Sequence, residues 1–297
     1  WVPSGPHGQQ HWPEGHPSCG GRAQSPINIQ TRRVQLDPSL PPIRPMGYHH
    51  PSTPTFTLAN NGHTAVLALP PSLWLQGLPH SFAAAQLHFH WGRPGHASGA
   101  EHLLDGRRAP AEVWGGPEGG GPEGMGVPTD APAWERGWVW EMAGELGWEM
   151  DLGVGNGCGE RAGWQTTAIP SFSVQDLLPP RLDLYYRYNG SLTTPPCFQT
   201  VLWTLFQQPV HISLAQLEQL QGALYATAAA EPEPQRLVDN FRVPQELNQR
   251  RVLVSFPTGE RRPLWGCTGE VITIVFGTIS ACLGIFLAVH FAAKRMR

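Results

Sequence analysis

The chain contains the segment Gln86-Leu87-His88-Phe89-His90-Trp91, in which polar and apolar side chains alternate. Alternate side chains of a β-strand project to the same face. The pattern therefore predicts a strand with His88 and His90 on one face and its three apolar side chains on the other. Two imidazoles on one face are half of a catalytic zinc site, which needs three protein ligands and one open position. On its own, however, a His-x-His pair more often marks surface or core histidines.

The remaining chain also favours strands. Leucines at helical spacing predict one helix over residues 214–225. With 34 Gly, 31 Pro and a charged fraction of 14%, the composition excludes a long-helix or coiled-coil protein. We expect a mainly β fold with short helices. The predicted strands are short segments rich in β-branched or aromatic residues: 55–58, 64–69, 84–91, 182–188, 198–206 and 251–256.

Length and charge exclude other classes of protein. The 297 residues suffice for one large domain or two small ones. Twenty basic residues stand against 23 acidic ones, the net charge is -3, and Lys294 is the sole lysine. Because no basic face is available for a phosphate backbone, we expect no nucleic-acid partner.

The C-terminal region predicts a membrane anchor. Residues 271–293 carry no formal charge unless His290 is protonated, and Lys294, Arg295 and Arg297 follow directly. At 1.5 Å per residue such a helix spans about 34 Å, enough to cross a bilayer, and the basic end belongs in the cytosol. We expect an extracellular domain over 1–257, a stem over 258–270 and a cytoplasmic tail over 294–297. The expected protein is a single-pass type I protein of the plasma membrane whose leader has been removed; a buried soluble helix is the alternative.

Residues 113–165 differ from the rest of the chain. They hold 15 of the 34 glycines and six of the 12 tryptophans, with no His, Ile, Phe or Tyr. Few aliphatic side chains and many glycines leave little to bury and raise the cost of ordering. We expect this glycine-rich segment to be a poorly ordered insert. A tryptophan-rich recognition loop, a splice variant or translated intron sequence are the other interpretations.

Five ordered motifs identify a family. QSPINI (24–29), ANNGH (59–63), QLHFHWG (86–92), AEH with DGRR (100–108) and YNGSLTTPPC (188–197) resemble the signature segments of the α-carbonic anhydrases. The resemblance implies a fold built on a central twisted sheet. It also implies zinc-dependent hydration of carbon dioxide to bicarbonate, and sulfonamide binding when zinc is bound.

The resemblance also implies roles for individual residues. His88 and His90 match two of the three zinc ligands, and Gln86 matches the outer-shell group that orients the first of them. Thr193 matches the hydroxyl that accepts a hydrogen bond from zinc-bound hydroxide. Glu101 matches the carboxylate that accepts the threonine proton.

Further matches surround these residues. His63 matches the proton shuttle, since an imidazole titrates near neutral pH. Cys19 and Cys197 match the disulfide of the extracellular members, and Asn189 begins a glycosylation sequon consistent with a surface loop. The substrate-site matches are Thr194 and the apolar wall formed by Leu192, Val201 and Trp203.

The match breaks at Val113. In the family a strand with the third ligand histidine follows a segment that Ala109-Pro110-Ala111-Glu112 matches, whereas here Val113-Trp114-Gly115-Gly116-Pro117 follows. We expect the central strand and its outer-shell glutamate to be lost, with recognisable sequence returning near Ile169. Zinc then has an incomplete site and the enzyme is impaired. The alternatives are an acatalytic interaction module, or replacement of the ligand by Cys158 or a carboxylate of the segment.

Overall fold

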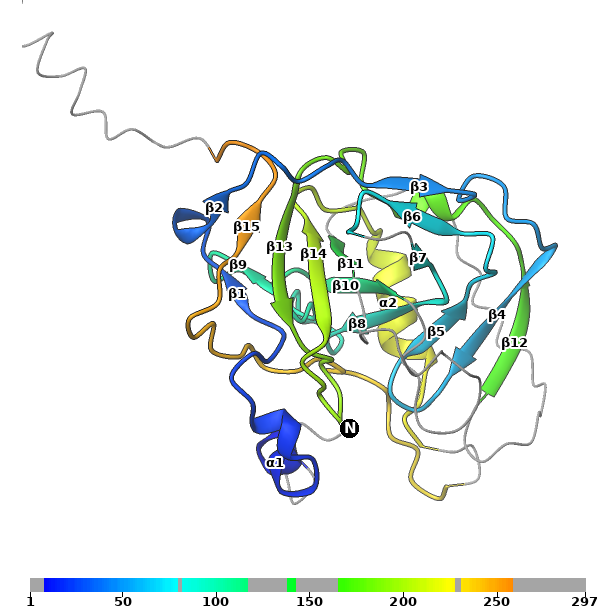
Figure 1. Ribbon diagram of the computed structural model, residues 1–297. Coiled ribbons are helices and arrows are strands. Elements are labelled where there is room, and N and C mark those ends of the chain that lie inside the picture. Colours follow the sequence, from blue (N-terminus) through cyan, green and yellow to red (C-terminus); the bar gives the residue numbers. More distant parts are fainter. Residues whose placement is uncertain (1–7, 80–81, 117–137, 143–164, 228–230, 259–297) are drawn as a thin grey trace, which may run out of the picture. The chain divides into compact units, whose positions relative to one another are not determined.

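The computed structural model describes residues 8–79, 82–116, 138–142, 165–227 and 231–258. The chain divides into two units, Trp1–Phe256 and Pro257–Arg297, and all described helices and strands belong to the first. At the centre is a ten-stranded sheet (Figure 1). Neighbouring strands are antiparallel except for the parallel pairs β11–β14 and β15–β2. From edge to edge the strands are β12 (Gln165–Pro170), β4 (Thr55–Asn60), β5 (Ala65–Ala68), β8 (Gln86–Trp91), β10 (Ala111–Gly116), β11 (Trp138–Met142), β14 (Val201–Phe206), β13 (Tyr185–Gly190), β15 (Leu253–Val254) and β2 (Gln35–Leu36).

Smaller elements surround this sheet. A parallel pair joins β1 (Asn28–Ile29) to β9 (Leu103–Leu104), and an antiparallel sheet joins β3 (Arg44–Met46), β6 (Trp74–Gln76) and β7 (Phe82–Ala83). The α-helices are α1 (Trp12–Gly15) and α2 (Leu214–Ala223), and the 3-10 helices are η1 (Gln9–His11), η2 (Pro17–Gly20), η3 (Thr31–Arg33) and η4 (Val174–Leu177). Each of the six predicted strand segments contains a strand, so the prediction of a mainly β fold with short helices is confirmed.

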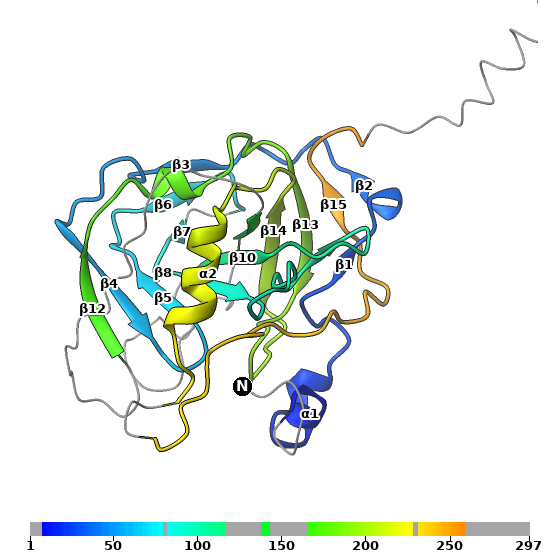
Figure 2. The same ribbon diagram turned by 180° about the vertical axis from the view of Figure 1, so that it is seen from behind.

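Strand β8 separates two cores. Its apolar side chains Leu87, Phe89 and Trp91 lie in the core that α2 covers with Leu217 and Leu220, and Figure 2 shows α2 in front of this face. Helix α2 begins as predicted and ends two residues before the predicted end. A capping box fixes its start, with the Ser213 hydroxyl accepting from the Gln216 backbone N–H at 3.2 Å.

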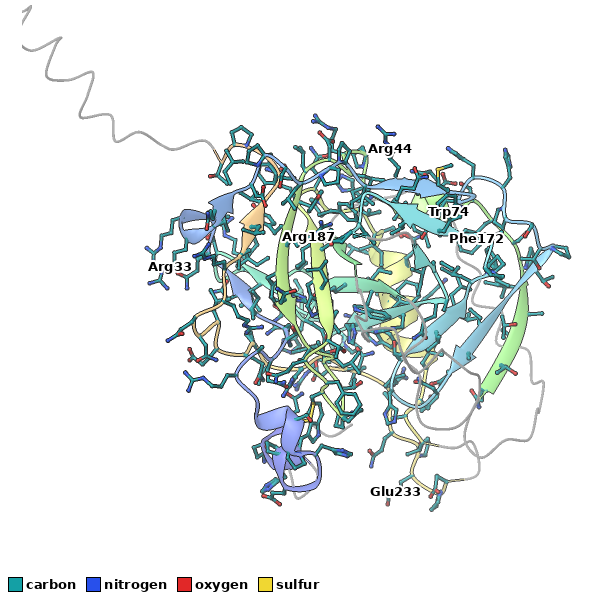
Figure 3. The ribbon with its side chains drawn as sticks, viewed as in Figure 1. Arg33, Arg44, Trp74, Phe172, Arg187 and Glu233 are labelled. Atoms are coloured by element: carbon teal, nitrogen blue, oxygen red, sulfur yellow. A yellow bond between two sulfur atoms is a disulfide. The ribbon has the colours of Figure 1, made fainter. Side chains whose placement is uncertain are left out.

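Side-chain contacts join neighbouring strands on both sides of the centre of the sheet. Arg187 on β13 lies opposite Thr204 on β14 and donates to its hydroxyl from Nη2 at 3.2 Å. Phe172, which follows β12, packs edge to face on Phe56 of β4 with ring centroids 5.3 Å apart. Figure 3 shows Arg187 on β13 and Phe172 beside β12, in opposite halves of the sheet.

The glycine-rich segment corrects one prediction. We expected no central strand from Val113 onward, yet β10 continues to Gly116, and all six of its residues are buried. Backbone pairing with β8 on one side and β11 on the other imposes the strand, because buried N–H and C=O groups need partners whatever the local propensity. β11 also lies within the segment predicted to be poorly ordered. Residues 117–137 and 143–164, with Cys158, lie outside the described residues.

The C-terminal predictions cannot be compared with the fold. The predicted stem, membrane helix (271–293) and tail lie outside the described residues, apart from Thr258. Within the part of the chain that the structure describes, no helix has the length and apolar character needed to cross a membrane.

Candidate active site

Two neighbouring strands present the candidate residues on one face of the sheet. On β8 and β10, His88 lies opposite Trp114 and His90 lies opposite Glu112. Residues directly opposite each other in an antiparallel pair share a face. The ring centroids of His88 and His90 are 5.2 Å apart. The alternation predicted for β8 is therefore confirmed, with the apolar side chains on the other face.

His90 has one satisfied and one open ring nitrogen. The ring is buried, and its Nδ1 lies 2.6 Å from the carbonyl oxygen of Asn240. A carbonyl only accepts, so Nδ1 carries a proton and Nε2 is the ring nitrogen left for another partner. Nε2 has no hydrogen-bond partner among the described residues, and Glu101 Oε2 lies 3.5 Å from it. A histidine that donates from Nδ1 to a backbone carbonyl has the orientation of a metal ligand that binds through Nε2.

Asn240 fixes the edge of β8 from a distant loop. Its side-chain amide donates to the carbonyls of His63 (3.1 Å) and Phe89 (2.9 Å) and accepts from the backbone N–H of Trp91 (2.7 Å). Together with the contact to His90, these bonds lock the ring orientation of that histidine. Sequence analysis missed Asn240, since a lone asparagine 150 residues from its partner carries no motif.

The Glu101 carboxylate is buried and only half satisfied. Oε1 accepts from the backbone N–H of Arg242 at 2.8 Å, while Oε2 has no partner in the described part of the chain. Thr193 is buried in the loop between β13 and β14, but the implied hydrogen bond from its hydroxyl to Glu101 is not formed. The geometry places Glu101 beside His90 and leaves the role of Thr193 a prediction.

Trp114 occupies the position on β10 opposite His88. Its indole stacks on the imidazole with ring centroids 4.5 Å apart and planes inclined by 28°. Burial, and next the neighbouring His90, hold the pKa of His88 well below its usual value, so the stacked ring is neutral. Trp114 shares a core with Val201 and Trp203, and Leu192 packs against it. The predicted apolar wall thus lies beside the face of the sheet that carries His88 and His90, here called the histidine face.

A second buried imidazole lies behind the site. His102 Nδ1 lies 2.9 Å from Glu112 Oε1, its backbone N–H donates to Oε2 at 2.7 Å, and its Nε2 lies 2.7 Å from the Tyr188 hydroxyl. Tyr188 in turn donates to Ser25 at 2.9 Å. Burial acts to raise the pKa of Glu112, but His102 outweighs it through charge and hydrogen bonds, so the pKa of Glu112 is lowered. Glu112, the last residue of the segment that matches the family before Val113, thus pairs with His102.

Three other predicted residues lie around this face. His63 lies in the loop between β4 and β5 with much of its surface exposed, and the protein around the rest of the ring desolvates it in part, which lowers its pKa. Gln86 lies opposite Gly116 on the face of His88, yet no hydrogen bond joins the described side chains of Gln86 and His88. The Thr194 carbonyl accepts from the Cys197 N–H at 2.8 Å and closes the turn at the disulfide.

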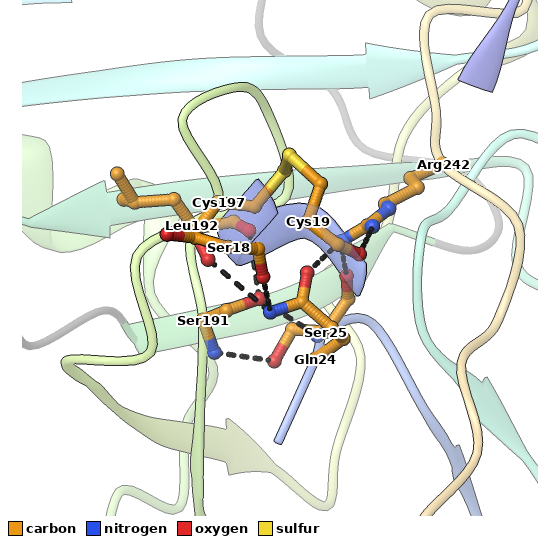
Figure 4. Close-up of a disulfide and its surroundings, with 8 residues drawn as sticks. All are labelled: Ser18, Cys19, Gln24, Ser25, Ser191, Leu192, Cys197 and Arg242. Atoms are coloured by element: carbon orange, nitrogen blue, oxygen red, sulfur yellow. Dashed lines mark hydrogen bonds between the residues drawn. A yellow bond between two sulfur atoms is a disulfide. The ribbon is translucent and has the colours of Figure 1, made fainter. Parts of the chain in front are cut away.

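The predicted Cys19–Cys197 disulfide is present (Figure 4). Gln24 Nε2 donates to the Cys197 carbonyl at 3.2 Å, and Arg242 Nη2 donates to the Cys19 carbonyl at 3.1 Å. Burial lowers the pKa of Arg242 to about 10, partly offset by Glu101. These bonds join the N-terminal segment to the loop of Thr193. Sequence analysis did not identify Arg242.

The sequon lies in a strand rather than in a loop. Asn189 is an exposed residue of β13, whereas Ser191 is buried and its hydroxyl accepts from the Ser25 N–H at 2.9 Å. The expectation of a surface loop at this position was therefore wrong.

The residues present do not fit a catalytic zinc ion. His88 and His90 supply two donors on one face, and the open Nε2 of His90 suits a metal. No group of three or more His, Cys, Asp or Glu side chains that could hold a metal occurs among the described residues. Trp114 stands where β10 would supply a third donor, and an indole N–H has no lone pair to offer. Two donors do not make the three-ligand site.

Comparison with known proteins places the chain. Residues 7–114 and 159–256 match the family model of the eukaryotic-type carbonic anhydrases. Human carbonic anhydrase 12 is 37% identical over 267 residues, which cover 86% of this chain and 73% of that protein. Mouse carbonic anhydrase 15 is 37% identical with coverage of 84% and 80%, and human carbonic anhydrase 6 is 32% identical with coverage of 85% and 82%. The match resumes at residue 159, earlier than we predicted. This chain is a member of the eukaryotic-type carbonic anhydrase family.

Proposed function

We propose that this chain is a carbonic anhydrase in which the family activity, the zinc-dependent reversible hydration of carbon dioxide to bicarbonate and a proton, is impaired. The observation that carries the proposal is the place of Trp114. It lies on β10 opposite His88, where a third donor would be needed, and the ring centroids of the two residues are 4.5 Å apart. Two imidazoles bind zinc far more weakly than three, and their proton-linked affinity falls further at low pH.

Several features support this function over an unrelated one. The open Nε2 of His90 and the carboxylate of Glu101 lie 3.5 Å apart on the buried face of β8. In our proposal Glu101 and Thr193 orient the attacking oxygen, His63 moves the proton, and Thr194 binds substrate. Leu192, Val201 and Trp203 provide the apolar surface for carbon dioxide.

The test uses the purified full chain with zinc added in excess. We expect well under one zinc per chain, hydration at least about 100-fold slower than that of human carbonic anhydrase 12 assayed alongside, and no tight sulfonamide binding. Stoichiometric zinc together with tight sulfonamide binding would contradict the proposed impairment. His90→Leu provides the background, because it removes one of the two candidate ligands, the imidazole whose buried Nε2 has no partner among the described residues.

The second candidate is an acatalytic interaction module. It is favoured by the same observation, because Trp114 joins the histidine face to a buried aromatic cluster and leaves that face without a third donor. The two functions differ in residual turnover. A hydration rate that His90→Leu lowers further supports the impaired enzyme, whereas a rate equal to that of this variant supports the module.

We also propose a location at the outer face of the plasma membrane. The support is the apolar segment 271–293 followed by three basic residues, a feature that resembles the single-pass membrane isoform numbered fourteen of the family. Protease treatment of intact cells that express the chain should cleave the domain and leave the C-terminal tail protected. A protected domain would contradict this location.

A further inference from the structure

Trp114 is held from three directions on the histidine face. It is 6% exposed, it stacks on His88, and its ring centroid lies 6.4 Å from that of Trp203 in an edge-on arrangement. Its six-membered ring extends over Gly116, since a Cβ atom built on Gly116 would overlap Cη2 and Cζ2 of the indole. The ring is therefore wedged into a place that the backbone leaves free for it.

Gly116 is required here by space rather than by backbone conformation. Its φ is not in the left-handed region, so another residue would suit the strand. Gly116 lies two residues beyond Trp114, on the same face and opposite Gln86. An aromatic ring that covers a strand glycine in this way shields the bare backbone and is itself fixed.

The partner of the stack is a candidate metal ligand. In zinc sites a histidine is oriented by the metal on one nitrogen and by an outer-shell acceptor on the other. His90 has its acceptor in Asn240, whereas no hydrogen bond to His88 is found among the described residues. The described ring contacts of His88 are the stack with Trp114 and an edge-on contact with His90, and the stack is the closer of the two.

We propose that Trp114, seated on Gly116, takes the place of a metal ion in holding His88, so that this face of the domain is organised without zinc. The inference rests on the proposed loss of the third donor, and it goes beyond it by giving Trp114 a structural task. The stack holds the imidazole in place by ring contact, and Trp114 covers the sheet where a third histidine and a metal would otherwise have to meet.

Thermal unfolding of the full chain tests this proposal. For the wild type we expect the same melting temperature in excess zinc and in a chelator. Trp114→His removes the stack and puts a third imidazole on the face of His88 and His90. In the chelator it should melt below the wild type, and zinc should raise its melting temperature by roughly 5 °C or more. Trp114→Phe keeps an aromatic ring without a donor and should stay insensitive to zinc.

A second arm moves the ring without changing its chemistry. Gly116→Ala displaces the Trp114 indole, because the added methyl group would overlap the ring. The ring-current shift of the His88 ring protons in NMR spectra should therefore shrink, and the melting temperature should fall. Gly15→Ala is the matched control, because a Cβ atom at Gly15 meets nothing within 4 Å. It should leave both readouts unchanged.

Two results would overturn the inference. One is a wild type that zinc stabilises as strongly as Trp114→His. The other is a Gly116→Ala variant with the His88 shifts and stability of the wild type, and this arm decides even if Trp114→His does not fold. The proposed function fails separately, through fast carbon dioxide hydration by the wild type, a readout that none of these melting curves contains.

Discussion

Two buried imidazoles, His90 on β8 and His102 directly before β9, differ in how many partners their ring nitrogens have. His102 has a partner at each ring nitrogen, the Glu112 carboxylate at 2.9 Å and the Tyr188 hydroxyl at 2.7 Å. His90 has a partner at Nδ1 only, and its buried Nε2 faces Glu101 Oε2 without a hydrogen bond. The two histidines are thus equally hidden from water and unequally satisfied.

The difference separates a structural site from a functional one. Burying a polar group without a partner costs free energy, so an unmatched atom persists where chemistry needs a free lone pair. The His102 group spans β10, β13 and the N-terminal segment through Tyr188 and Ser25, as expected of a part that holds the fold together. The His90 group keeps the features of a ligand, while the described residues supply no third donor beside it.

The largest expected loss of unfolding free energy comes from breaking the satisfied site, which is His102 with its partners Glu112 and Tyr188. His102→Leu leaves the Glu112 carboxylate buried without its counterpart and removes a partner of Tyr188. Removing one member of a buried pair costs about 3 to 5 kcal/mol of unfolding free energy. Urea unfolding at pH 7, followed by circular dichroism, measures the loss.

Glu112→Gln is the control for His102→Leu. The amide oxygen still accepts from the His102 backbone N–H, so the loss should be smaller. A loss below about 1 kcal/mol in His102→Leu would show that the buried group is not a structural site.

The matched substitution at His90 should lower the free energy of unfolding by less. His90→Leu removes the bond to the Asn240 carbonyl but also removes a nitrogen that has no partner among the described residues. We expect a loss of about 1 to 2 kcal/mol, measured in the same urea titration. If His90→Leu proves as harmful as His102→Leu, the contrast between the two sites disappears.

The fold could be predicted where the sequence pattern was local. Alternation identified β8, and leucine spacing identified α2. Strand β10 was missed beyond Glu112 because Gly115 and Gly116 have poor strand propensity and open a glycine-rich segment. The conformation of this stretch is set by hydrogen bonds to β8 and β11. β11 lies in a segment whose composition predicted no order, and it too is fixed by pairing rather than by pattern.

The sequence predicted the site residues that stand in motifs, but not the residues that position them. His88, His90 and Glu101 stood in recognisable motifs, and they meet on one face. Asn240 and Arg242 position His90 and Glu101 from a loop far along the chain, mainly through backbone groups, which leave no trace in side-chain patterns. The hydrogen bond expected between Thr193 and Glu101 is absent although both residues stand in motifs. A motif predicts which residues lie near one another, and it does not predict each hydrogen bond between them.

Acid should weaken the satisfied site through Glu112. The pKa of Glu112 is lowered in the folded chain, because His102 outweighs the effect of burial, so the ionised carboxylate stabilises the fold above the unfolded value of 4.5. This contribution is lost as the pH falls below that value, by at most about 1.4 kcal/mol per pH unit for one proton. Urea titrations between pH 6 and pH 3.5 should show a shallower decline for Glu112→Gln than for the wild type. Parallel declines would mean that Glu112 does not carry the acid sensitivity.

The smallest effect is expected at His88, which completes the comparison. Its ring is neutral, no hydrogen bond to it is found in the described part of the chain, and its contact is the stack on Trp114. His88→Phe keeps that stack with a ring of similar size, so we expect a change in unfolding free energy below about 1 kcal/mol. His88→Ala loses the ring and should cost more. A loss of several kcal/mol in His88→Phe would mean that the imidazole nitrogens matter to the fold, and His88 would then belong with His102 rather than with His90.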